Sequence, residues 1–289
     1  MNEKAFQFGP ANCLTGTLCT PAESDRDRPV VLILNAGVVH RSGPFRLHVD
    51  IARRLARVGF SSMRLDLSGL GDSGVRNEVR SSDNRALLDA SDAMDFLESE
   101  TGASRFLVVG LCSGAYNSHH VAVDDNRVVG AVFMDGVVYP TEEHIRRKRM
   151  RRLTRPRKVR NAIKRRLVGD AIEEDNPDAP DASEFFAVEK PASQVAREIT
   201  RLLDRNLQLL FIYTEGYSDI SSRDQFAEMF DMLPNEDQLQ VDYYDNFEHT
   251  FRLAAHRETI VARVASWCGE RFANAGIMAE HSELGSAQF

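Results

Sequence analysis

The sequence of 289 residues has few cysteines, a single tryptophan and no long uninterrupted apolar run. Its four cysteines are so widely spaced that they fit neither a disulfide framework nor a zinc site. No apolar run approaches the roughly 18 residues that a membrane span needs. The amino terminus lacks a cationic flank followed by an apolar stretch, so we expect no signal peptide. These absences favour a cytoplasmic protein with no metal and no other cofactor.

The composition is that of a globular protein, with 43% apolar and 27% charged residues and a formal net charge of -7. The charge is unevenly distributed. The range 146–166 holds 13 Lys and Arg in 21 residues, and the range 170–189 holds eight acids. This pattern fits either a solvated helical excursion or a docking patch for an anionic partner. We expect no nucleic acid as the partner, because the rest of the chain is acidic and carries no recognised nucleic-acid module.

Short apolar runs alternate with helix-length amphipathic segments along most of the chain. This alternation predicts an α/β fold, with a mostly parallel, doubly wound sheet and an antiparallel hairpin formed by the amino-terminal residues. The expected strands are Val30–Leu34, Ser61–Leu65, Phe106–Val109, Val128–Phe133, Leu207–Tyr213 and Leu239–Tyr244, and the expected helices include Phe45–Val58 and Leu87–Glu98.

The alternation stops between residues 139 and 206. This range has no convincing strand and contains both charged blocks and five prolines. We therefore expect a core formed by residues 1–138 and 207–273, interrupted by a helical, highly charged cap at 139–206. The low apolar content of residues 274–289 predicts a flexible tail.

The segment with the clearest chemical content is the apolar run FLVV followed by Gly110-Leu111-Cys112-Ser113-Gly114 and a helix-compatible stretch. A nucleophile flanked by glycines between a strand and a helix is typical of a nucleophile elbow. The helix amino terminus would help to stabilise a thiolate and a developing oxyanion. Cys112 is the predicted nucleophile. Two alternatives stay open: Ser113 as the nucleophile, and Cys112 as a small buried residue in a tight turn.

A general base and an orienting acid should follow the nucleophile in the order acid, then histidine. His249 comes after the strand Leu239–Tyr244 and is the predicted base. Asp219 lies on the loop after the preceding strand and is the predicted acid, with Glu215 as its competitor. The remaining histidines are expected at the surface or in packing positions.

The loop after Val30–Leu34 is expected to supply part of an oxyanion hole. Gly37 permits a close turn, and the backbone N–H groups of Val38 and Ser113 are the predicted donors. A plain glycine turn is the alternative for this loop.

Together these segments resemble the α/β-hydrolase superfamily, in its branch with a cysteine nucleophile (GxCxG), over nearly the whole chain. The run from Asp66 to Ser73 is similar to the family's D-x-x-G-x-G-x-S turn, in which both residues would be structural. The segments NAGVVHRSGPFR, RLDLSGLGDSG and GLCSGA are similar to those of the exosortase-associated hydrolases, although Ser113 stands where that subfamily has an acidic residue.

This resemblance implies an enzyme that processes acyl groups. A Cys112–His249–Asp219 triad would act on an ester, thioester or lactone through a covalent acyl-cysteine, by hydrolysis or by acyl transfer. The expected partner is a small acyl substrate, which an acyl-carrier protein docked on the basic cap could present. A serine esterase that uses Ser113 and a non-catalytic binding protein are the alternative functions.

Overall fold

The computed structural model describes residues 1–23, 25, 27–76, 82–147, 190–217, 219–235 and 237–272. Most of the predicted cap and the whole predicted tail therefore lie outside the described residues. Within these ranges, no helix combines the length and the hydropathy needed to cross a bilayer.

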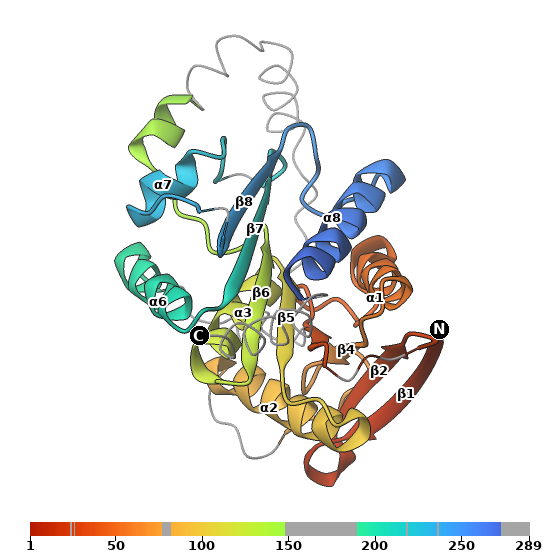
Figure 1. Ribbon diagram of the computed structural model, residues 1–289. Coiled ribbons are helices and arrows are strands. Elements are labelled where there is room, and N and C mark those ends of the chain that lie inside the picture. The colour runs from red at the N-terminus through yellow and green to blue at the C-terminus, as the bar shows by residue number, and fades with distance from the viewer. Residues whose placement is uncertain are drawn as a thin grey trace, which may run out of the picture.

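A single eight-stranded sheet forms the centre of the molecule, in the order β1-β2-β4-β3-β5-β6-β7-β8 (Figure 1). The strands β4, β3, β5, β6, β7 and β8 run parallel, whereas β1 and β2 are antiparallel and form the predicted amino-terminal hairpin at one edge. The strands are β1 (Asn2–Phe8), β2 (Leu14–Thr20), β3 (Val30–Ile33), β4 (Ser62–Asp66), β5 (Phe106–Leu111), β6 (Val128–Met134), β7 (Gln208–Thr214) and β8 (Leu239–Tyr244).

Helices cover both faces of the sheet, which explains why the central strands are apolar without alternation (Figure 1). Helices α1 and α8 lie side by side on one face, and α2, α3, α6 and α7 cover the other. The helices are α1 (Leu47–Arg57), α2 (Ser82–Thr101), α3 (Ser113–Asp124), α6 (Ala192–Asp204), α7 (Gln225–Phe230) and α8 (Ala254–Phe272), with short 3-10 turns at Pro10–Asn12 and Pro44–Arg46.

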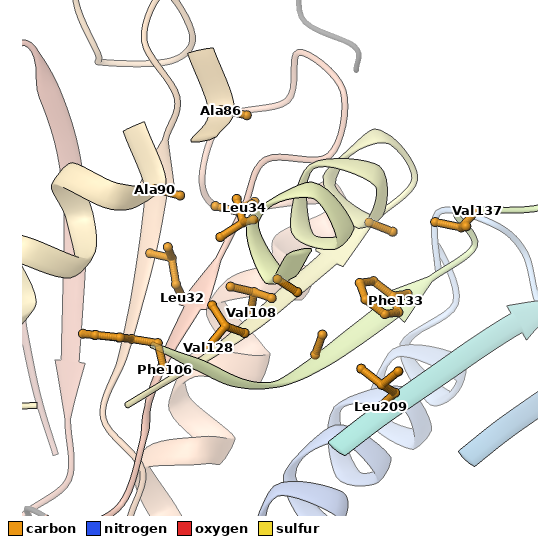
Figure 2. Close-up of a cluster of buried hydrophobic side chains, with 14 of the residues drawn as sticks. Leu32, Leu34, Ala86, Ala90, Phe106, Val108, Val128, Phe133, Val137 and Leu209 are labelled. Carbon is orange, nitrogen blue, oxygen red and sulfur yellow. The ribbon is translucent and has the colours of Figure 1, made fainter. Parts of the chain in front are cut away.

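The larger apolar core lies between the sheet and the second set of helices. Figure 2 shows Leu32, Val108 and Phe133 of the central strands pointing toward this layer, with Ala86 and Ala90 of α2 packed nearby. All of these side chains are at least 95% buried. The predicted α/β class and the six predicted strands are confirmed, with strand ends shifted by one or two residues.

Helix α6 falls inside the range 139–206 that the sequence assigns to the cap. Its residues Val195, Ile199 and Leu202 are buried in the larger core, so this helix belongs to the layer that covers the sheet. Residues 190–204, which precede β7 in the chain, are therefore part of the core. The charged blocks themselves lie mostly outside the described residues, and for them the cap stays a prediction.

Candidate active site

Cys112 lies at the junction between the carboxyl end of β5 and the first turn of α3. Its backbone has φ 58° and ψ -121°, a conformation that non-glycine residues rarely adopt. The turn is held by the N–H of Cys112, which donates to Met134 O at 2.9 Å, and by the N–H of Ala115, which donates to Cys112 O at 3.0 Å. The half-buried thiol is thereby placed above the sheet edge where the parallel strands end.

The glycines on both sides of Cys112 are required by close packing. A Cβ on Gly110 would lie 2.0 Å from Gly114 O, and a Cβ on Gly114 would lie 2.4 Å from Asn35 O. Gly136, after β6, is similarly confined, since its Cβ would approach Cys112 O to 2.7 Å. The sequence pattern Gly-x-Cys-x-Gly therefore has a direct steric cause.

His249 is brought to Cys112 by the loop after β8. The imidazole makes a side-chain hydrogen bond with Cys112, and its Nδ1 lies 3.0 Å from Asp135 Oδ2. Since Nδ1 is taken by the carboxylate, Nε2 is the nitrogen that remains for sulfur. Gly216 allows the loop after β7 to approach the backbone of His249 closely, because a Cβ on Gly216 would lie 2.5 Å from His249 N.

Asp135, directly after β6, is the acid of this arrangement. Its side chain is fully buried and accepts hydrogen bonds from Thr214 N at 2.7 Å and Thr214 Oγ1 at 2.6 Å. The backbone of Asp135 has φ 45°, a left-handed conformation, and its carboxylate meets His249 Nδ1 at 3.0 Å. Burial raises the pKa of Asp135, and the hydrogen bonds with His249 and Thr214 oppose that change.

The prediction that Asp219 orients His249 is corrected by this geometry. The single N–H at Nδ1 donates to one carboxylate, and Asp135 is that acceptor. Asp219 and Glu215, the two acids predicted from the sequence, both lie on the loop after β7 and have other contacts. Gln225 Nε2 donates to Asp219 O at 2.6 Å, and Glu215 Oε2 accepts from Asn246 N at 3.0 Å. The chain order of nucleophile, acid and histidine is kept, but the acid follows β6 instead of β7.

The protonation of His249 reflects its two partners. Burial disfavours the imidazolium, but the hydrogen bonds with Asp135 and Cys112 and the negative charges of both outweigh it and raise the pKa of His249 to about 9. Tyr217 packs against the imidazole with ring centroids 4.9 Å apart. Burial, together with nearby Tyr116 and Cys112, raises the pKa of the Tyr217 phenol, so this ring stays neutral beside the pair.

The loop after β3 passes over the first turn of α3, next to Cys112. The N–H of Gly37 donates to Ser113 Oγ at 2.7 Å. The hydroxyl of Ser113 is thus directed at this loop, while His249 is bonded to Cys112. Ser113 also begins α3, so its own N–H has no acceptor within the helix and is available to an anion at Cys112.

Asp66 anchors the base of the same loop from the end of β4. It is fully buried and accepts from Asn35 Nδ2 at 3.0 Å, from Arg41 N at 2.6 Å and from Asp72 N at 3.1 Å. Ser73 Oγ donates to Asp66 O at 2.6 Å. Asp66 and Ser73 have the structural contacts that the family resemblance implies.

His40, Asp66 and Asp72 lie close enough to share a metal ion, as no other group of such ligands does in the described part of the chain. However, Arg41 Nη1 lies 2.5 Å from Asp66 Oδ2 and 2.8 Å from Asp72 Oδ2. The guanidinium supplies the positive charge that these carboxylates need, so the cluster is explained as an ion-pair network.

The residue that sequence reasoning missed is Asp135. A signal was present, since Met134-Asp135-Gly136 places an acid and a glycine directly after an apolar strand. The carboxyl ends of adjacent parallel strands share one edge of the sheet, so this acid was a candidate on the same grounds as Asp219.

Comparison with known proteins places the fold. No protein-family model and no curated protein sequence matches this chain. Among solved structures, the α/β hydrolase GrgF from Penicillium sp. sh18 is similar over 94% of this chain and 100% of its own, with 14% identity and a TM-score of 0.59.

Two further structures show the same architecture. The dienelactone hydrolase from Anabaena variabilis ATCC 29413 is similar over 94% of this chain and 98% of its own, with 12% identity and a TM-score of 0.58. The esterase Pf2001 from Pyrococcus furiosus is similar over 94% of this chain and 91% of its own, with 15% identity and a TM-score of 0.60. At these identities the similarity concerns the fold, which is that of the α/β hydrolases.

Proposed function

We propose that this chain, an α/β-hydrolase fold, is an acyl-processing enzyme that forms a covalent acyl-Cys112 intermediate. The observation that carries the proposal is the contact of His249 with both Cys112 and Asp135 above a strained strand–helix turn. A nucleophile bonded to a base, with the base oriented by a buried acid, is the arrangement that nucleophilic catalysis requires.

In the proposed reaction, Cys112 Sγ attacks the carbonyl carbon of an ester, thioester or lactone, and His249 holds the thiol proton. The carbonyl π electrons move to oxygen, where the N–H groups of Val38 and Ser113 stabilise the oxyanion. Collapse of the tetrahedral intermediate breaks the bond to the leaving group, which takes the proton from His249. A water or another acceptor then gives a proton to His249 and attacks the thioester, which releases the acyl group and restores Cys112.

Asp135 orients the His249 ring and stabilises its imidazolium form. The distribution between hydrolysis and transfer depends on the acceptor, because an acyl-cysteine can persist until water, an alcohol, an amine or a thiol reaches it. We assign the enzyme to thioesterase, esterase or acyltransferase chemistry on this basis. We place it in the cytoplasm, since a reducing compartment keeps Cys112 as a free thiol.

The test is intact mass spectrometry after incubation with an activated acyl ester. The wild type should gain one acyl group, and Cys112→Ala should gain none. Cys13→Ala is the matched control, because Cys13 is also partly exposed but lies at the amino-terminal hairpin, and it should acylate as the wild type does. An adduct that persists in Cys112→Ala and disappears in Ser113→Ala would assign the serine as nucleophile. An absence of any adduct on the wild type across ester, thioester and lactone probes would favour a binding protein.

An acyl-carrier protein remains the proposed partner on charge grounds. The first residues of the basic range are described: Arg147 pairs with Glu228 of α7 at 2.5 Å, and Arg146 pairs with Glu143 at 2.7 Å. Neutralising Arg146–Arg152 should slow turnover of a carrier-bound acyl group and leave turnover of a free thioester unchanged. Equal turnover of the carrier-bound substrate by both proteins would remove the carrier from the proposal.

A further inference from the structure

One hydrogen bond joins the two halves of the proposed oxyanion hole. The N–H of Gly37 donates to Ser113 Oγ at 2.7 Å, although the two residues are 76 positions apart in the chain. Ser113 is only 7% exposed, whereas Gly37 is half-buried, so the bond lies partly out of solvent. It connects the tip of the β3 loop to the first residue of α3, which directly follows the nucleophile.

The loop is otherwise anchored at its base. Asn35 Nδ2 donates to Val39 O at 2.8 Å, and Asn35 Oδ1 accepts from Leu67 N at 2.7 Å. The N–H of Val39 closes a turn on Ala36 O at 3.1 Å. Gly37, with φ 57°, lies between these contacts. Its N–H is held by the Ser113 hydroxyl, which lies next to the nucleophile.

The bond also decides which N–H of the loop can meet a substrate. Because the N–H of Gly37 is used by Ser113, the next one in the chain, that of Val38, is the donor left for a carbonyl oxygen. Among the described residues the N–H of Val38 has no protein hydrogen-bond acceptor, and its side chain is 53% exposed. A change in the Gly37 peptide would rotate this donor.

We propose that the Ser113 hydroxyl is a positioning group that holds the β3 loop with the Val38 N–H directed at the oxyanion formed on Cys112. The inference rests on the proposed function, since it assigns a role in the same acyl transfer. Ser113 acts twice, with its backbone N–H as a direct donor and its hydroxyl as the acceptor that fixes the second donor.

This role has a kinetic signature. Acylation by an ester passes through an oxyanion, whereas alkylation of Cys112 by iodoacetamide is a direct displacement of iodide by sulfur with no oxyanion. Alkylation therefore depends on Cys112 and His249 but not on the hole. Loss of one oxyanion donor typically lowers the rate about 100–1000-fold. A donor that is misplaced but still present should lower it by about 10–100-fold.

The experiment compares wild type, Ser113→Ala, Ser113→Thr and Ser118→Ala. Ser118 is a buried serine of the same helix whose hydroxyl has no hydrogen-bond partner among the described residues, so Ser118→Ala is the matched control. Three quantities are measured: the rate of acyl-enzyme formation with an activated ester, the rate of iodoacetamide alkylation, and hydrogen exchange of the Gly37 amide.

Ser113→Ala should acylate about 10–100-fold more slowly, alkylate within about twofold of wild type, and exchange its Gly37 amide faster. Ser113→Thr, which keeps the hydroxyl, should recover most of the acylation rate, and Ser118→Ala should match wild type in all three quantities. Unchanged acylation in Ser113→Ala would overturn the proposal, as would an equal loss of alkylation. A wild type that alkylates but never acylates would instead refute the proposed function, while Gly37 exchange still tests the bond itself.

Discussion

At the scale of single residues, the geometry around Cys112 depends on positions that tolerate no side chain. Gly114 lies in the first turn of α3 and faces the β3 loop, where a methyl group would meet Asn35 O at 2.4 Å. Backbone oxygen cannot move aside as a flexible side chain can. The close approach of loop and helix is also what brings Gly37 to Ser113.

Gly114→Ala should therefore destabilise the protein by about 1–3 kcal/mol and lower acylation of Cys112. Gly269→Ala is the control, since Gly269 lies in the last turn of α8 and its Cβ would meet no described atom within 4 Å. That change should stabilise the protein by about 0.5–1 kcal/mol, because alanine loses less backbone entropy in a helix. Urea unfolding of both variants tests the pair, and equal midpoints would contradict the packing argument.

We expect His249 to make the acylation rate fall at alkaline pH, which gives the pH–rate profile an alkaline limb. Its pKa of about 9 means that the imidazole keeps its proton at neutral pH and loses it as the pH rises. An alkyl ester, whose leaving group needs that proton, should react more slowly above about pH 9. A thiol leaving group needs it less, so thioesters should show a weaker decline.

Asp135→Asn should move this limb to lower pH, because the negative charge that stabilises the imidazolium is removed and the amide oxygen is a weaker acceptor than the carboxylate. Asp219→Asn is the control and should leave the limb in place. The measurement is the pH dependence of acylation under single-turnover conditions. A limb that shifts with Asp219 and not with Asp135 would restore the acid predicted from sequence.

At the scale of elements, a buried hydrogen bond connects the nucleophile helix α3 to α6. His119 Nε2 lies 2.8 Å from Glu198 Oε2, and Lys190 Nζ lies 2.9 Å from Glu198 Oε1. Gln194 Nε2 donates to the same carboxylate at 3.0 Å. Burial alone would raise the pKa of Glu198, but these three hydrogen bonds outweigh it and hold the pKa far below its usual range.

Glu198→Ala should cost about 1–3 kcal/mol, because His119, 1% exposed, would lose its hydrogen-bond partner inside the core. Asp95→Ala is the contrasting change, since Asp95 pairs with Arg127 but its side chain is 64% exposed. An exposed pair of this kind contributes less than about 1 kcal/mol. Thermal or urea unfolding measures both, and similar losses would show that burial does not decide the strength of these pairs.

At the scale of the whole molecule, three titrating groups favour maximal stability near pH 6.5. Burial, reinforced by Arg64, lowers the pKa of His48 to about 4 from an ordinary value of 6.5, so this histidine destabilises the fold as the pH falls from 6.5 toward 4. Glu198, with a lowered pKa, adds a loss below pH 4.5. His249 has the opposite effect, because its pKa is raised. The stabilisation that its imidazolium gives the fold is complete below pH 6.5 and is lost as the pH rises through about 9.

The free energy of unfolding should therefore decline on both sides of about pH 6.5, with His48 responsible for about 3 kcal/mol on the acid side. His48→Leu should flatten the decline between pH 6.5 and 4, and Asp135→Asn should flatten the decline toward pH 9. Urea midpoints at pH 4.5, 6.5 and 9 test this. A steeper acid decline in His48→Leu would contradict the assignment.

The α/β class, the positions of the strands along the chain, and the candidate pair Cys112 and His249 can be inferred from the amino-acid sequence alone. These follow from local patterns: continuous apolar runs, helical periodicity, and glycines around a strand–helix turn. Such patterns depend on residues that are close together in the chain, so they can be recognised without knowing the fold.

The acid that meets His249 and the partner of the Ser113 hydroxyl depend instead on contacts that form only in the folded chain. Asp135 and Asp219 are both near the ends of parallel strands, and their local sequences are equally compatible with an orienting acid. The choice depends on sheet order, because β6 lies between β5 and β7 and Thr214 fixes the Asp135 carboxylate beside the nucleophile. The bond from Gly37 to Ser113 likewise joins segments that meet only when β3 and β5 pair in register.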